Sequence, residues 1–167
     1  MDNNFKMVAK TLFGFEDLLA NELLKLGAQD IEKGVRNVSF VGDKGFMYKA
    51  NLGLRTAIKI LKPIKSFRVH SEQELYSQIF KMKWEDYLKP SGSLAVDATV
   101  HSQTFKHSQF VALKTKDAIV DRFREFAGER PNVDLRFPDL KINIHIDRNQ
   151  CTVSLDTSGE SDRKSVV

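Results

Sequence analysis

The alternation of apolar and polar residues divides the first third of the chain into six short elements. The segment "FKMVAK" alternates as a strand, and "EDLLANELLKL" places Leu19, Leu23 and Leu26 on one face of a helix that stops at Gly27. Their order predicts a ferredoxin-like βαββαβ domain, an antiparallel sheet with both helices on one face. The expected strands are residues 5–10, 30–35, 37–42 and 56–64, and the expected helices are residues 16–26 and 46–54.

After Pro63 the pattern indicates a second, α/β domain. Ser71 and Glu74 have the spacing of a capping box before an amphipathic helix, and the isoleucines of "KINIHID" alternate as in a half-buried strand. We therefore expect an α+β protein with an N-terminal domain over residues 1–66, a second domain over residues 67–160 and a tail over residues 161–167. The expected helices are residues 71–80 and 108–127, and the expected strands are residues 94–101, 132–137, 141–147 and 151–159.

The polar segment His101–Gln109 leads into the longest predicted helix. Core packing explains the helix, because its apolar residues recur at spacings of three, four and seven. It does not explain the polar segment, for which two interpretations stand. Either the unpaired N–H groups of the helix start bind a phosphate beside the polar side chains, or Ser108 merely caps the helix after a solvated loop. The helical face comprises Ala112, Ile119, Phe123 and Phe126, and the polar donors are Ser102, Gln103, Thr104, Lys106 and His107.

Composition narrows the class of protein. With 167 residues and 41% hydrophobic content, the chain can form one or two small cores. Its apolar stretches are too short for a membrane span, and it lacks a signal peptide pattern, so we expect a soluble cytoplasmic protein. A single cysteine, Cys151, forms no internal disulfide, and with four scattered histidines it supplies no structural zinc site. We expect no metal.

Positive charge is concentrated in one segment. The net charge is +4, and Lys44–Arg68 carries seven basic residues and no acidic one. Such a block is either a solvated face or the electrostatic footprint of a phosphate-backbone binder. The candidate contacts in this block are Lys49, Arg55, Lys59, Lys62, Lys65 and Arg68.

Enzymatic motifs are missing from the sequence. There is no Gly-x-Gly-x-x-Gly, no Gly-x-x-x-x-Gly-Lys-[Ser/Thr] and no Gly-x-Ser-x-Gly, so we expect no catalysis by this chain.

Two single residues each have two interpretations. Lys116 falls on the apolar side of its helix, where its amine either snorkels over the core edge or contacts RNA. Trp84 is either a stacking platform or a core residue.

Several segments, in order, resemble the THUMP domain and its N-terminal ferredoxin-like partner in large-subunit ribosomal RNA methyltransferases. "LKTKDAIVDRF" is similar to the signature helix, and "ELYSQIFKMKWEDYL" to the entry helix of the THUMP domain. "KTLFGFEDLLANELLKLGA" and "YKANLGLRTAIKIL" resemble the start and end of the ferredoxin-like domain, and "CTVSLDTSGES" the strand that ends the module. Members of this family are often labelled adenine-specific DNA methylases.

The resemblance implies a module that binds structured RNA, with large-subunit ribosomal RNA as its partner, for an S-adenosylmethionine-dependent guanine-N2 methyltransferase. Family chains continue past "SGES" into a basic linker and a Rossmann-type catalytic domain, whereas this sequence ends "SGESDRKSVV". We therefore expect S-adenosylmethionine to belong to a catalytic domain that this chain lacks and that acts in cis or in trans. The alternatives are a module of a tRNA-modifying enzyme and a protein-interaction domain without RNA contact.

These features give one set of expected RNA contacts. It comprises the six basic residues of the Lys44–Arg68 block, the polar segment at the helix entrance, and two lysines of the helix itself. The residues outside the basic block are His101, Ser102, Gln103, Thr104, Lys106, His107, Gln109, Lys114 and Lys116.

Overall fold

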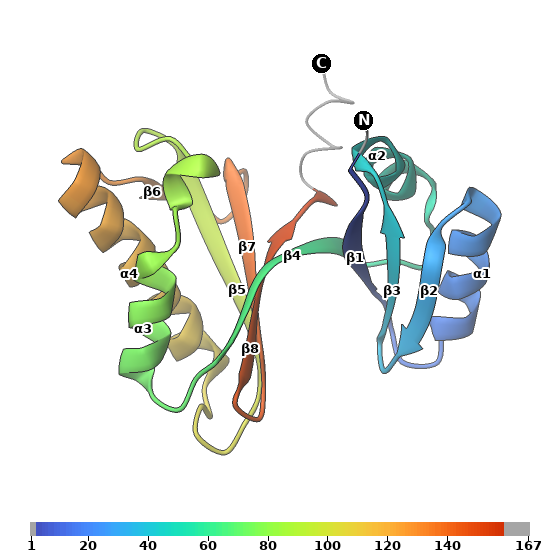
Figure 1. The fold of residues 1–167 in the computed structure, drawn as a ribbon, viewed down its shortest axis with the longest axis horizontal. Coiled ribbons are helices and arrows are strands. Elements are labelled where there is room, and N and C mark those ends of the chain that lie inside the picture. Colours follow the sequence, from blue (N-terminus) through green and yellow to red (C-terminus); the bar gives the residue numbers. More distant parts are fainter. Residues whose placement is uncertain (1–2, 159–167) are drawn as a thin grey trace. The chain divides into compact units, whose positions relative to one another are not determined.

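The chain divides into two units of helices and strands. The structure is a computed structural model that describes residues 3–158 (Figure 1). The first unit extends to Pro63 and also includes residues 156–158, and the second unit is Ile64–Leu155. Strand β4, Lys59–Arg68, runs through this division and through the boundary expected after residue 66. The expected tail over residues 161–167 lies outside the described residues.

The first unit has the strand order β2-β3-β1-β4. Strand β3 pairs antiparallel with β1 and β2, and β1 also pairs antiparallel with β4. Ala9 of β1 lies opposite Val38 on β3 and Ile60 on β4. The described bounds are β1 Phe5–Lys10, α1 Glu16–Leu26, β2 Gln29–Gly34, β3 Asn37–Gly42 and α2 Lys44–Gly53. The predicted ferredoxin-like arrangement is confirmed.

The core of the first unit lies between one face of this sheet and the two helices. Its buried residues are Met7, Ala9, Leu19, Leu23, Val38, Phe40, Met47, Ala50 and Ile60. Leu26, predicted on the same helical face as Leu19 and Leu23, is only half-buried. Helix α1 ends because Gly27 adopts a left-handed conformation, with φ of 102°, and donates its N–H to the carbonyls of Leu23 and Leu24. Helix α2 begins two residues earlier than expected, because the Asp43 side chain accepts the N–H of Phe46 at 2.7 Å.

The second unit has the strand order β4-β8-β7-β5-β6. Strands β5 and β7 are parallel, with helix α4 in the connection between them, and β7 and β8 form an antiparallel hairpin. Its remaining bounds are α3 Glu72–Lys81, the short 3₁₀ helix η1 Trp84–Asp86, β5 Ser93–His101, α4 Ser108–Ala127, β6 Asn132–Val133, β7 Leu140–Asp147 and β8 Gln150–Asp156. The strand expected over residues 132–137 is wrong beyond Val133, because the Asp134 side chain accepts the N–H groups of Arg136 and Phe137 and turns the chain.

Two large aromatic residues occupy the core of the second unit. Trp84 is fully buried and donates its indole N–H to the Ile79 carbonyl at 2.8 Å, so it is a core residue and not a stacking platform. Phe123 is also fully buried, whereas Phe126, predicted for the same helical face, is 61% exposed. Phe126 lies in the last turn of α4, where its ring instead contacts Phe80 and the Arg122 guanidinium.

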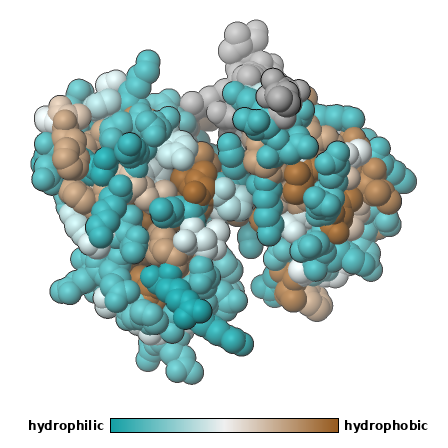
Figure 2. Space-filling view, in the orientation of Figure 1, coloured by the Kyte–Doolittle hydropathy of each residue, from teal (hydrophilic) through white to brown (hydrophobic). Residues whose placement is uncertain are grey.

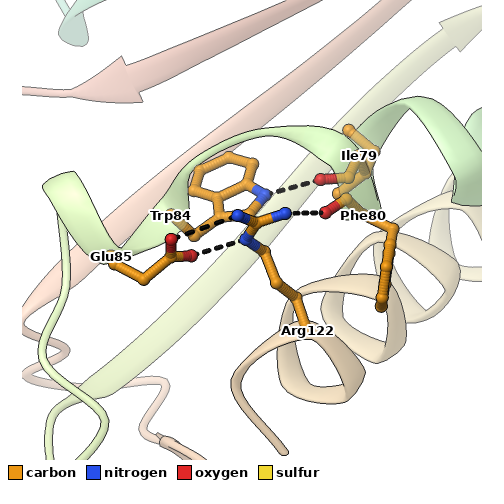
Figure 3. A network of polar contacts seen from close by, with 5 residues as sticks. All are labelled: Ile79, Phe80, Trp84, Glu85 and Arg122. Carbon is orange, nitrogen blue, oxygen red and sulfur yellow. Dashed lines mark hydrogen bonds and ion pairs between the residues drawn. The ribbon is translucent and has the colours of Figure 1, made fainter. Parts of the chain in front are cut away.

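A polar network fixes α4 against α3 and η1 (Figure 3). Arg122 donates to the Phe80 carbonyl at 2.7 Å and to the Glu85 carboxylate through two nitrogens. Because Phe80 lies in the last turn of α3, the guanidinium satisfies a carbonyl that the helix itself leaves unpaired. The last part of α4 is therefore held in place by its bonds to neighbouring elements.

Candidate nucleic-acid interface

The loop between β5 and α4 is anchored to the unit that carries it. The Ser102 hydroxyl accepts the backbone N–H groups of Thr104 and Phe105, at 3.1 and 3.3 Å, and closes a tight turn. Phe105 is only 3% exposed and belongs to the core of the second unit. The polar side chains on either side of Phe105 are therefore presented by a loop that is pinned to the core.

Helix α4 begins without a side-chain cap. Its first residue is Ser108, and the N-cap is His107, which makes no side-chain capping hydrogen bond. The interpretation in which Ser108 caps the helix is therefore wrong, since the hydroxyl lies one position too far along. The first N–H groups of the helix lack acceptors within the helix and carry part of the positive end of its dipole. Lys106, His107 and Gln109 are exposed around them.

A surface pocket of about 570 Å³ lies beside this loop. The turn of the β7–β8 hairpin forms its other wall, because the Arg148 N–H bonds to the His101 carbonyl at 2.7 Å. The backbone of the neighbouring Asn149 is also fixed, since its carbonyl accepts the Val69 N–H at 2.8 Å. The pocket is lined by His101, Ser102, Gln103, Thr104, Arg148 and Asn149.

Arg148 and Asn149 are the residues of this pocket that the sequence pattern did not single out. Both lie in a two-residue hairpin turn between Asp147 and Gln150, which pair with each other. Arg148 adopts a left-handed conformation with φ of 58°, which is uncommon for a residue other than glycine or asparagine. The sequence "IDRNQCT" does indicate a turn, because the dipeptide Arg148-Asn149 lies between two predicted strands. The parallel pairing of β5 with β7 is needed to place this turn beside His101.

The two helix lysines among the expected contacts are engaged within the unit. Lys114 lies with its amine 5.7 Å from the centre of the Tyr76 ring on α3. Lys116 is 31% exposed and forms an ion pair of 2.8 Å with Asp117. The partial burial of Lys116 fits a lysine that covers the edge of the core.

The expected basic block is divided between the two units. Lys65 and Arg68 are exposed on the part of β4 that belongs to the second unit, and the other four residues belong to the first. Two of those four have internal partners: the Lys49 amine donates to the Leu26 carbonyl at 2.9 Å, and the Lys62 amine lies 4.2 Å from the centre of the Phe5 ring. Arg55 is exposed and Lys59 is partly buried.

The strongest shifts of pKa lie away from the loop and have structural causes. A hydrogen bond to the Asp121 carboxylate raises the pKa of Tyr76 to about 12. Burial raises the pKa of the Cys151 thiol to about 12, so this thiol is unreactive at neutral pH.

Within residues 3–158 no cluster of three or more His, Cys, Asp or Glu side chains could hold a metal ion. In the same part of the chain, no helix is long and apolar enough to cross a membrane.

Two family models match the chain, one for each unit. The model described as THUMP domain matches residues 69–156, and the model described as RlmL ferredoxin-like domain matches residues 6–61. These matches define a two-domain module, a ferredoxin-like domain followed by an α/β domain. The chain belongs to the THUMP domain family.

The relatives of this chain are much longer proteins. A ribosomal RNA large subunit methyltransferase K/L of Syntrophotalea carbinolica is 42% identical over 161 residues, which cover 96% of this chain and 23% of the relative. The protein of the same name from Cellvibrio japonicus is 45% identical over 148 residues, which cover 89% of this chain and 20% of the relative. The chain therefore spans about a fifth of the length of these relatives.

A solved structure shows the same fold. The crystal structure of a predicted N6-adenine-specific DNA methylase from Listeria monocytogenes superposes with a TM-score of 0.76 at 24% identity. The match covers 92% of this chain and 40% of the other.

Proposed function

We propose that this chain is the RNA-binding part of a ribosomal RNA methyltransferase, with large-subunit ribosomal RNA as its partner. The observation that carries the proposal is the uncapped start of α4 beside a pocket that Arg148 helps to line. Unpaired N–H groups and a guanidinium are donors suited to phosphate oxygens. The names of the relatives support ribosomal RNA as the class of partner.

In this proposal the backbone of a structured RNA passes the start of α4. Gln103 and Lys106 reach phosphates from the loop, while the helix N–H groups and Arg148 add donors on either side. Contacts to phosphate fix the position of the RNA without reading its sequence. The choice of the nucleotide to be modified therefore rests on the shape of the RNA and on the methyltransferase domain.

Filter-binding titrations at two salt concentrations test the proposal. Fragments of large-subunit ribosomal RNA, transfer RNA and duplex DNA serve as competing ligands, and Arg148→Ala is compared with Lys89→Ala, which removes an exposed lysine outside the pocket. We expect ribosomal RNA to bind best, affinity to fall steeply with salt, and only Arg148→Ala to weaken binding. Preference for transfer RNA would instead favour a module of a tRNA-modifying enzyme, and failure to bind any of the three ligands would favour a protein-interaction domain.

We also propose that S-adenosylmethionine binds a catalytic domain outside this chain. The support is the lack of a Gly-x-Gly-x-x-Gly sequence that could follow a strand and open a helix. Titration calorimetry of the chain with S-adenosylmethionine should show no heat of binding. Micromolar affinity would contradict this part of the proposal.

A further inference from the structure

Two lysines face each other across neighbouring strands of the first unit. Strands β1 and β4 pair antiparallel, and in their register Lys10 lies directly opposite Lys59. Both side chains are half-buried. Side chains at opposed positions have Cβ atoms about 4.5 to 5.5 Å apart, so two like charges there repel each other and destabilise the strand pair. We name these two residues the lysine pair.

The lysine pair lies on the face of the sheet that the two helices leave uncovered. Side chains alternate between the two faces along a strand. Ala9 and Ile60, the sequence neighbours of the pair, belong to the core that contacts α1 and α2. Lys10 and Lys59 therefore point to the opposite face. Hydrophilic residues occupy much of the visible surface of this unit (Figure 2), so the pair is distinguished by its register and its partial burial rather than by its polarity.

The electrostatic surroundings of Lys10 favour a bound anion. Burial and the charge of Lys59 both lower the pKa of the Lys10 amine. Within residues 3–158, no acidic side chain forms an ion pair with Lys10. The acidic residues of the sheet, Asp30 and Glu32, both lie on β2, which β3 separates from β1. An anion between the two amines would relieve their repulsion and stabilise the protonated form of Lys10.

The backbone that carries the lysine pair is fixed by hydrogen bonds. The Ile58 N–H donates to the Lys10 carbonyl at 2.7 Å. Next to it, the buried Thr11 hydroxyl donates to the Thr56 carbonyl at 2.6 Å. These bonds hold the two strands together at the pair, so both amines start from neighbouring positions and can reach one small ligand. Little backbone order has to be gained when that ligand binds.

The surface around the lysine pair decides the class of ligand. Strands β1, β3 and β4 expose no large hydrophobic side chain, whereas the centre of an interface with a folded protein is apolar. A ligand held by charge alone fits this surface, and a phosphate group has several oxygens that accept hydrogen bonds from both ammonium groups. We propose that the lysine pair binds one phosphate group of an RNA backbone between its two amines.

This inference rests on the proposed function for the source of the phosphate. It adds a second site, because the lysine pair belongs to the first unit and the start of α4 to the second. It also adds Lys10, which lies outside the basic block Lys44–Arg68, to the residues that contact RNA.

NMR of the lysine amines tests the inference on the whole chain. Reductive methylation with isotope-labelled formaldehyde labels each amine and keeps its charge, and Lys10→Gln assigns the Lys10 signal by its absence. A fragment of large-subunit ribosomal RNA should move this signal and raise the pKa of the Lys10 amine, because a bound phosphate stabilises the ammonium form. The signal of Lys25, which is exposed on α1, is the control and should not respond.

Substitutions at Lys10 give the second arm of the test. Lys10→Met should raise the melting temperature of the free chain, because it removes one of two opposed charges, and should weaken RNA binding roughly tenfold. Lys10→Arg keeps the charge and should retain most of the affinity. Lys6→Met is the matched control for stability, because Lys6 is exposed on the same strand and lies opposite Val41, so its melting temperature should hardly change.

Three results would overturn the inference. If the chain binds RNA and the Lys10 signal does not move, the phosphate contacts lie elsewhere and the proposed function stands. If inorganic phosphate moves the signal and RNA does not, the lysine pair binds a free anion and not an RNA backbone. If the wild-type chain binds no RNA in the filter assay, the proposed function fails and the inference loses its ligand.

Discussion

The two helices of the second unit begin in opposite ways. At the start of α3, the Ser71 hydroxyl accepts the Glu74 N–H at 3.2 Å and the Glu74 carboxylate accepts the His70 N–H at 3.0 Å. This reciprocal pair closes the helix end. At the start of α4, His107 occupies the N-cap position and makes no such bond. One helix end is satisfied by the chain itself, and the other offers its N–H groups to solvent or a ligand.

The difference between the two helix starts shows that different parts of α4 serve stability and binding. An uncapped end forgoes roughly 1 kcal/mol that a serine or aspartate would contribute. Helix α4 tolerates that loss because it is 20 residues long and buries Val111, Ile119 and Phe123 along its length. Its first turn is therefore available for binding, while the rest of the helix maintains the fold.

The largest expected effect concerns the buried part of α4. Phe123→Ala should lower the free energy of unfolding by about 3 to 5 kcal/mol, because removal of the fully buried ring leaves a cavity. Denaturant unfolding measures this change, and Phe126→Ala is the control, with a decrease of roughly 1 kcal/mol or less from an exposed ring. Equal decreases in the two variants would mean that the core of this unit is not where the structure places it.

The next effect concerns the loop before α4. Gln103→Ala with Lys106→Ala should reduce RNA affinity by roughly 1 to 3 kcal/mol, because the variant can no longer donate an amide and an ammonium hydrogen bond to the RNA. The melting temperature should be almost unchanged, since both side chains are exposed. If the double variant binds RNA as tightly as the wild type, the segment is only a solvated loop.

Exchanging the two kinds of helix start sharpens the comparison directly. His107→Asp should raise the free energy of unfolding by about 1 kcal/mol and weaken RNA binding, because the carboxylate caps the N–H groups and repels phosphate. His107→Ser supplies a cap without charge and separates the two contributions. Ser71→Ala should cost about 1 kcal/mol of stability with no change in RNA affinity. Undiminished RNA binding by His107→Asp would argue against a phosphate at this helix start.

The smallest expected effect is that of the basic block. Replacing Lys59, Lys62 and Lys65 by alanine should weaken all RNA ligands similarly. The slope of log affinity against log salt should fall by up to about 0.7 for each phosphate of a single strand that the variant no longer binds. Titrations at several salt concentrations measure this slope, and an unchanged value would show that these lysines bind no phosphate.

The sequence is most informative where local periodicity and long-range packing agree. Helix α4 has the predicted bounds, since its apolar spacing and Gly128 both specify them. The pattern wrongly predicts that Phe126 is buried, because the periodicity of one helix does not show where the neighbouring elements end and leave its last turn exposed. Strand β4 is predicted over residues 56–64 but spans Lys59–Arg68, because its later residues gain their partners from β8 rather than from the local pattern.

Only part of the candidate site can be predicted from the sequence. The loop residues stand out because no apolar pattern explains them. Arg148 and Asn149 do not, since they reach the loop through the register of β5 with β7, in which His101 lies opposite Asp147. Phe105 is likewise hidden, because a single aromatic residue in a polar segment carries no periodicity.

The bonds of Arg122 also have a consequence for the order in which the second unit opens. Because one guanidinium joins the end of α3 to η1 and α4, these three elements cannot open one at a time without breaking its bonds. Amide hydrogens in the last turn of α3 and the second half of α4 should therefore exchange with solvent in a single shared event. The first turn of α4, which lies outside this linkage, should exchange much earlier, so that the part of the helix available to a ligand is also the part that moves most readily.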